Sequence, residues 1–181
     1  MPNLPFLTGL IGSFILVTGA AWPDKIVPHP TKSIKNWLLT IGTVFMFTYA
    51  VMGYLTGGAI FFIFLQSLVI LASILMMANT NDTLDLIILS SISLALILTS
   101  LFLFEDHSTI FFILGLTGVA LGYTMEMGSI RRQIALTAGS ILIAIFSYLT
   151  SDWIFFWLNI FFAIFAGYYT TKGLLKPKNH A

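Results

Sequence analysis

The sequence predicts an all-α membrane protein with seven transmembrane helices, arranged as two parallel three-helix bundles plus one linking helix. Three observations predict this class. Of the 181 residues, 58% are hydrophobic and only 8% are charged, whereas a soluble domain carries roughly a quarter of its residues as charged side chains. Apolar runs long enough to cross a bilayer fill nearly the whole chain. The first three of these runs also resemble the last three.

Each expected span is an apolar run of about 17 to 20 residues or more, bounded by charged or turn-forming residues. No Lys or Arg precedes the first run, so it is expected to be a retained helix and not a signal peptide. The breaks that separate successive runs are Pro23 to Asn36, Thr56-Gly57, Asn79 to Thr83, Glu105 to His107, Gly128 to Arg132 and Thr150 to Asp152. The seven runs are Leu4 to Trp22, Trp37 to Leu55, Gly58 to Met77, Leu84 to Phe104, Thr109 to Met125, Gln133 to Leu149 and Trp153 to Tyr169.

The fifth to seventh runs are near the minimum length of a span, so six spans or a re-entrant segment are alternatives. The distribution of basic residues favours seven spans. With seven spans, one face of the membrane carries every basic residue: Lys25, Lys32, Lys35, Arg131, Arg132, Lys172, Lys176 and Lys178. The opposite face carries Glu105, Asp106 and Asp152. The positive-inside rule then places the N-terminus outside and the C-terminus in the cytoplasm. The compact length and the lack of a transit segment favour a prokaryotic plasma (inner) membrane.

Composition also excludes several classes of function. The formal net charge of +1 provides no basic field for nucleic acid. The chain has no cysteine, and His29, His107 and His180 have no second ligand three or four residues away, so we expect no metal site and no other cofactor.

An internal repeat is predicted from matched glycine and hydroxyl positions. Gly9 to Gly12 in the first span matches Gly115 to Gly118 in the fifth, and Thr40 to Thr43 matches Thr137 to Ser140. A gapless alignment from Tyr54 and Tyr148 onward relates the third and seventh spans. Three helices is an odd number, so a parallel repeat needs one reversing helix between its halves. The expected units are residues 1–78, a linking helix in 79–107, residues 108–171 and a basic cytoplasmic tail, 172–181.

In this 3+1+3 arrangement the chain resembles the SWEET sugar facilitators, the PQ-loop group and the PnuC-type vitamin transporters. Trp37 and Gln66 look like the Trp and Gln of PnuC-type proteins, and Asn159 looks like the intramembrane Asn of SWEETs. No Pro-Gln dipeptide ends the first or fifth span, and the PnuC tryptophan-rich signature is incomplete. The resemblance implies facilitated diffusion of a small polar solute such as a vitamin, a nucleoside or a sugar.

The residues expected to contact that solute are polar or aromatic side chains within the spans. Gln66 and Asn159 offer donors and acceptors without burying a charge, although an amide in a span also serves helix packing. The gapless alignment pairs Asn159 with Leu65, so a shared role needs a one-residue shift of register. The further candidates are Thr43, Ser140, Tyr54 and Trp157.

Other features have simpler interpretations. Gly9, Gly12, Gly115 and Gly118 are expected to allow close helix contact. Glu126 lies near Arg131 and Arg132, so an ion pair at the helix end is favoured over proton coupling.

The leading function is a transporter, not an enzyme. Its expected partners are membrane lipid and a small molecule, and a homo-oligomer is left open. The alternatives are an accessory or scaffold subunit and an integral membrane enzyme acting on lipid.

Overall fold

The computed structural model describes residues 4–22, 29–126 and 129–175, which fold into α-helices with no β-strand among them. Six residues named above lie outside the described residues: Pro23, Lys25, Gly128, Lys176, Lys178 and His180. The helices are α1 (Leu4–Ala21), α2 (Ile34–Leu55), α3 (Phe61–Ala78), α4 (Asp82–Phe102), α5 (Ser108–Thr124), α6 (Ile130–Leu149) and α7 (Trp153–Leu175), with a short 3-10 helix at Pro30–Lys32.

These helices confirm the predicted all-α class. Six of them are long and apolar enough to cross a membrane, and α5 is equally apolar with 17 residues, which is the lower limit for a span. The protein is an integral membrane protein with six to seven helical spans. The observed bounds follow the expected runs closely, except that α7 continues to Leu175, into the segment expected to be a tail.

Short polar side chains cap the N-terminal ends of α2, α4 and α6. The hydroxyl oxygens of Ser33 and Ser129 accept hydrogen bonds from the backbone N–H groups of Asn36 (3.3 Å) and Arg132 (3.2 Å). The Asn81 side-chain oxygen accepts from the N–H of Thr83 at 3.0 Å. These bonds satisfy donors that a helix start leaves without partners, so local sequence fixes where α2, α4 and α6 begin.

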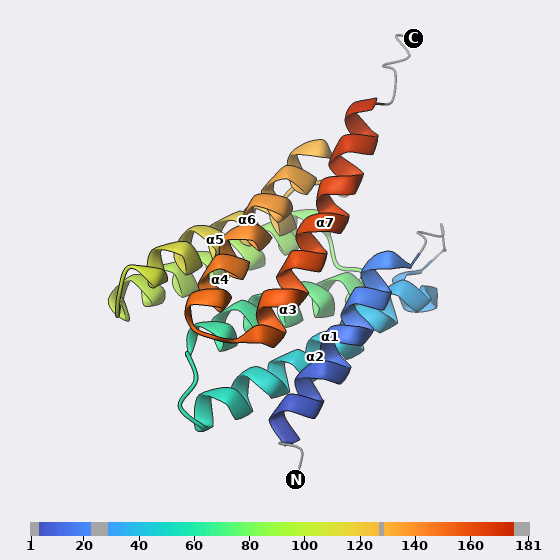
Figure 1. The fold of residues 1–181 in the computed structure, drawn as a ribbon. Coiled ribbons are helices and arrows are strands. Elements are labelled where there is room, and N and C mark those ends of the chain that lie inside the picture. The colour runs from blue at the N-terminus through green and yellow to red at the C-terminus, as the bar shows by residue number, and fades with distance from the viewer. Residues whose placement is uncertain (1–3, 23–28, 127–128, 176–181) are drawn as a thin grey trace, which may run out of the picture.

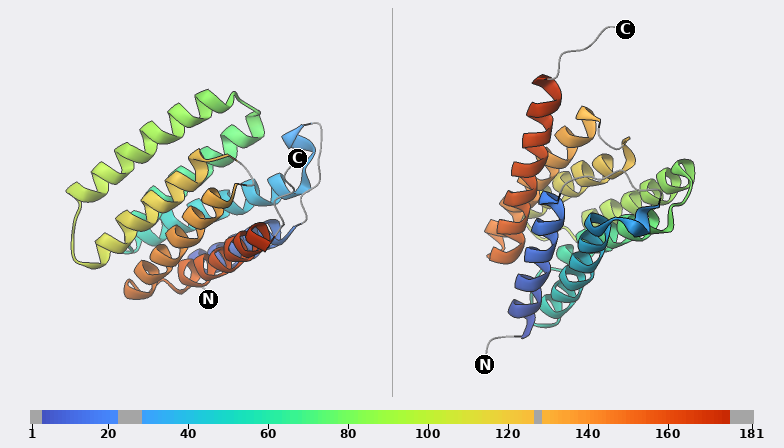
Figure 2. Two further views of the ribbon diagram at one scale, coloured as in Figure 1. Left: turned by 90° about the horizontal axis from the view of Figure 1, so that it is seen from above. Right: turned by 90° about the vertical axis from the view of Figure 1, so that its right-hand side faces the viewer.

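The helices form a ring in chain order, in which each packs on the next and α1 closes the ring against α7. Figure 1 shows successive helices running in opposite directions. Among the described residues α4 packs only on α3 and α5, and it lies at the edge of the bundle (Figure 2). The helix α3 also contacts α5.

Leaving α4 aside, the pattern of helix contacts is the same for the first triplet (α1 to α3) and the second (α5 to α7). In each triplet the first helix packs on the second and the second on the third. Between triplets, α1 packs on α7 and α3 packs on α5. Exchanging the triplets therefore leaves this contact pattern unchanged.

Glycine allows the close approach of paired helices, as predicted. A Cβ atom at Gly12 would lie 2.8 Å from the Cβ of Phe45 in α2. A Cβ atom at Gly118 would lie 2.8 Å from the Cα of Gly139 in α6. These two contacts are not equivalent, because Phe45 and Gly139 are not paired positions of α2 and α6. A Cβ atom at Gly12 would lie 3.1 Å from the backbone nitrogen of Met46, and one at Gly115 would lie 3.0 Å from that of Ile143, the position paired with Met46. Gly12 therefore corresponds to Gly115 in the structure, about one helical turn away from its predicted match, Gly118.

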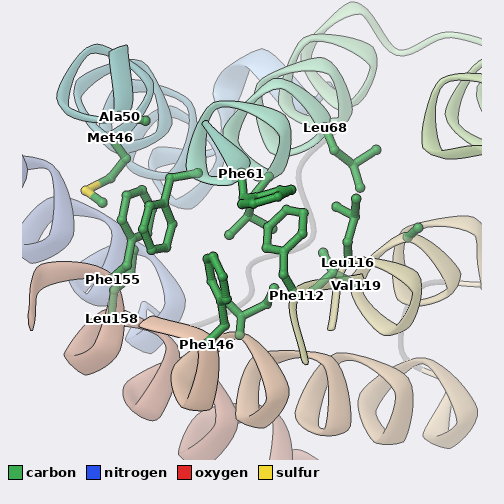
Figure 3. Packing of buried hydrophobic residues seen from close by; sticks show 14 of the residues in the cluster. Met46, Ala50, Phe61, Leu68, Phe112, Leu116, Val119, Phe146, Phe155 and Leu158 are labelled. Carbon is green, nitrogen blue, oxygen red and sulfur yellow. The ribbon is translucent and has the colours of Figure 1, made fainter. Parts of the chain in front are cut away.

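Five phenylalanines fill the core at one end of the bundle, and Figure 3 labels four of them, Phe61, Phe112, Phe146 and Phe155. We call them the phenylalanine cluster: Phe61, Phe62, Phe112, Phe146 and Phe155. They come from α3, α5, α6 and α7, and each is at most 4% exposed. The rings of Phe62 and Phe155 stack in parallel, with centroids 4.3 Å apart and an interplanar angle of 2°.

Candidate functional site

A cavity of about 1030 Å³ occupies the other half of the bundle, and every helix contributes to its lining. We call this half the basic end, because Lys35 and Arg132 line the cavity there. The opposite, acidic end carries the loops with Asp106 and Asp152. Exposed residues such as Asp82 line the cavity at the basic end, so it reaches the surface there.

Four of the six predicted contact residues line this cavity. Thr43, Gln66, Ser140 and Asn159 come from α2, α3, α6 and α7, and their exposed fractions are 0%, 3%, 6% and 7%. The fold therefore brings two hydroxyls and two carboxamides from separate helices to one buried space.

Tyr54 and Trp157 are not among the residues that line the cavity. Their side chains are 45% and 55% exposed on the surface of the bundle. Trp157 precedes Asn159 by two residues, which is about 200° of helix rotation, so the two point to opposite sides of α7. Tyr54 lies at the far end of α2, about 16 Å of helix rise beyond Thr43.

Corresponding positions of α2 and α6 line the cavity. The alignment that pairs Gly42 with Gly139 also pairs Lys35 with Arg132, Leu39 with Leu136 and Thr43 with Ser140, and all six of these residues line the cavity. In each helix they recur every fourth residue, which places them on one face.

The cavity-lining residues of α3 and α7 also correspond, but one residue out of step with the sequence alignment. Gln66 pairs with Asn159 in this register, and the alignment had paired Leu65 with Asn159. The same spacing relates the stacked rings of Phe62 and Phe155. The cavity-lining pairs are Leu65 and Leu158, Gln66 and Asn159, Val69 and Phe162, Ala72 and Phe165, Ser73 and Ala166, and Met76 and Tyr169.

The hydrogen-bond partners of the two carboxamides differ. Asn159 donates from Nδ2 to the carbonyl oxygen of Phe155 at 2.8 Å, which leaves its Oδ1 as an acceptor. Gln66 Oε1 is buried and has no partner among the described residues. Two other buried oxygens share that lack, Thr40 Oγ1 and Ser93 Oγ, but neither of those residues lines the cavity. An unsatisfied buried acceptor costs about 1 to 3 kcal/mol.

The basic end of the cavity carries charges of both signs. Besides Lys35 and Arg132, the lining includes Asp82, Asp85 and Glu126. The Thr80 hydroxyl donates to the Asp85 carboxylate. The ion pair expected between Glu126 and the arginines is not found in the described part of the chain: the extended backbone of Met125 (ψ 154°) turns away from α5 before Glu126.

The acidic end of the bundle is closed. Phe62 and Phe155 lie one helical turn before Gln66 and Asn159, so the phenylalanine cluster lies beyond these two amides, toward the acidic end. Sequence reasoning missed a second closure, because its two partners are far apart in the chain. The Tyr49 hydroxyl lies 3.0 and 3.1 Å from the two carboxylate oxygens of Asp152, to which it donates.

Asp152 also caps α7, because its Oδ1 accepts from the backbone N–H of Phe155 at 3.1 Å. Burial raises the pKa of the Asp152 carboxyl above its ordinary value, although hydrogen bonds from the Phe155 backbone and the Tyr49 hydroxyl act in the opposite direction. At the acidic end α2 is therefore joined to α7 through a half-buried carboxylate.

Comparisons with protein families, with curated proteins and with solved structures find no match to this chain. The geometry of the cavity is therefore the feature that indicates a function.

Proposed function

We propose that this protein is a transporter that moves a small polar solute across the membrane by alternating access. The observation that carries the proposal is Gln66, whose buried Oε1 has no partner among the described residues, in the lining of a cavity that Asn159, Thr43 and Ser140 also line. Burying an acceptor without a partner is unfavourable, and a solute that brings a hydrogen-bond donor removes that cost while it is bound.

The distribution of open and closed ends supports alternating access. The cavity reaches the surface at the basic end and is separated from the acidic end by the phenylalanine cluster and the Tyr49–Asp152 pair. By the positive-inside rule the basic end faces the cytoplasm, so this arrangement would be open inward. The N-terminus is then outside, and a prokaryotic plasma membrane remains our expected location.

The equivalence of the two triplets supports a mechanism in which they rock against each other around the amide residues. Matched positions of α2 and α6, and of α3 and α7, line the cavity, as a parallel repeat in the 3+1+3 arrangement would require. On this basis the chain would work like the SWEET and PnuC-type transporters that it resembles, with α4 as the linking helix.

The hydrogen-bonding groups of the cavity indicate the class of solute. Asn159 Oδ1 and Gln66 Oε1 are acceptors, and the Thr43 hydroxyl already donates to Leu39 at 2.7 Å. A solute with several hydroxyl or amide donors, such as a sugar or a nucleoside-like vitamin, would satisfy them. Facilitated diffusion needs no further energy source.

Uptake by proteoliposomes tests the proposal. The protein would be presented with labelled sugars, nucleosides and nicotinamide-type vitamins, and we expect uptake of one class to exceed that of empty vesicles. Asn159→Leu should reduce this uptake at least about tenfold, the effect of losing about 1.4 kcal/mol of binding. Trp157→Leu, which lies outside the cavity, is the matched control on the same helix. Uptake of no solute, together with co-purification of a partner, would favour an accessory subunit instead.

A further inference from the structure

Arg132 is a cavity-lining cation with no anionic partner among the described residues. It is half-buried, no hydrogen bond or ion pair to its guanidinium is found there, and the electrostatic interaction that it does have is with the uncharged side chain of Tyr123. Arginine stays protonated at any physiological pH, so the charge persists. A partly buried and unpaired cation is unfavourable unless something else pairs with it.

The position of Arg132 on α6 makes this charge still less favourable. It is the third residue of the helix, in the first turn after the Ser129 cap. The N-terminal end of a helix carries partial positive charge, which favours anions and disfavours cations. The guanidinium and the helix end therefore both present positive potential to the mouth of the cavity.

The acidic residues of the same mouth have local explanations. Asp82 and Asp85 lie in the first turn of α4, where helix geometry favours negative charge, and Asp85 accepts a hydrogen bond from Thr80. Glu126 is exposed and solvated. The positive-inside rule favours basic residues on this face of the membrane, and the exposed Arg131 already meets that preference. The rule therefore does not explain why Arg132 faces the cavity.

We infer that Arg132 forms an anion-binding subsite at the basic-end mouth, which takes the carboxylate or phosphate group of the transported solute. This inference rests on the proposed function and narrows it to solutes that carry an acidic group as well as hydrogen-bond donors. Arg132 and Ser140 are eight residues apart on α6, about 12 Å of helix rise. The subsite is thus separate from the amide residues. A solute that enters from the basic end reaches Arg132 before it reaches them.

Phosphate binding to the purified protein tests the subsite without depending on transport. The protein would be held in a maltoside detergent free of phospholipid, and its thermal unfolding would be followed against inorganic phosphate, with chloride at equal ionic strength as reference. A ligand that binds the folded protein raises its unfolding temperature. We expect phosphate to stabilise the wild type and Arg131→Gln to the same extent, and Arg132→Gln to bind phosphate at least about tenfold more weakly.

A second variant covers the case in which Arg132→Gln does not fold. Arg132→Lys keeps the charge but loses the two-pronged geometry that suits phosphate, so an intermediate phosphate affinity is expected. Equal phosphate affinity in the wild type, the Arg131 variant and both Arg132 variants would overturn the inference. Stabilisation that requires added phosphatidylglycerol and is absent with free phosphate would assign Arg132 to a lipid headgroup and would also overturn it. Phosphate binding at Arg132 in a protein that transports no solute would contradict the proposed function alone.

Discussion

At the scale of single residues, Gln66 lowers the stability of the empty protein and is proposed to bind the solute. Gln66 is 3% exposed and its Oε1 has no partner among the described residues. A leucine at this position would fill similar space without a polar atom. Residues selected for binding a solute commonly reduce the stability of the empty protein, and Gln66 fits that pattern.

Replacing Gln66 by leucine should therefore separate stability from transport. We expect Gln66→Leu to raise the free energy of unfolding by about 1 kcal/mol, because an unsatisfied acceptor is removed, and to lower uptake at least about tenfold. Denaturation in detergent and uptake by proteoliposomes measure the two quantities. A variant that is destabilised and yet transports normally would show that Gln66 serves packing.

Asp152 should make uptake depend on the pH at the acidic end. In the closed arrangement burial raises the pKa of the carboxyl above 3.8, so the closed form binds a proton more tightly than a form in which water reaches Asp152. Protonation thus favours closure, and this advantage is lost as the pH rises from 3.8 through the raised pKa.

The expected result is slower uptake when the pH at the acidic end is lowered from about 7 toward the ordinary carboxyl range near 4. In Asp152→Asn, which cannot titrate, this dependence should disappear while basal uptake persists. Uptake measured at fixed internal pH checks the prediction. An unchanged pH profile in the asparagine variant would assign the effect to another group.

At the scale of helices, matched glycines set the distance between paired segments. A Cβ atom at Gly139 would lie 2.7 Å from the backbone nitrogen of Val119, and backbone cannot move aside as a side chain can. Overpacking of this kind costs typically about 1 to 3 kcal/mol. Gly53 lies on α2 with nothing within 4 Å of the position of its Cβ.

Alanine substitutions at these two glycines should have different effects on stability. We expect Gly139→Ala to destabilise the protein by about 1 to 3 kcal/mol, and Gly53→Ala to be neutral or stabilising, because alanine favours helix by up to about 1 kcal/mol. Thermal unfolding in the same detergent compares them. Equal effects would mean that α5 and α6 do not approach closely at this point.

Sequence predicted the helices well because apolar runs and polar breaks are local signals. The start of α2 is an exception. The apolar run predicts a start at Trp37, whereas the Ser33 cap starts the helix at Ile34. Trp157 was expected in the site on chemical grounds, whereas counting residues from Asn159 around the helix would have placed it on the opposite side.

Two further features depend on the fold and could not be predicted from local sequence. The one-residue change of register between α3 and α7 becomes clear only when the cavity shows Gln66 and Asn159 at equivalent positions. The hydrogen bonds between Tyr49 and Asp152 join helices that are distant in the chain. A gapless alignment contains no information about either.

At the scale of the whole molecule, the cavity is open at the basic end and closed at the acidic end. The phenylalanine cluster and the Tyr49–Asp152 pair lie on one side of Gln66 and Asn159, and charged residues lie on the other. If the triplets rock against each other, these two sides must open in turn. Access to the buried residues between them is then the property that distinguishes a transporter from a static bundle.

Because the natural chain has no cysteine, a single Ser140→Cys variant gives an unambiguous report of that access. Labelling with a membrane-impermeant thiol reagent, applied separately to each face of oriented vesicles, is the most direct measurement, with Trp157→Cys as the control outside the cavity. The account predicts rapid labelling from the basic face, slower labelling from the acidic face, and protection by a transported solute. Labelling of Ser140→Cys from neither face, or from the basic face alone with no effect of any solute that is taken up, would contradict it.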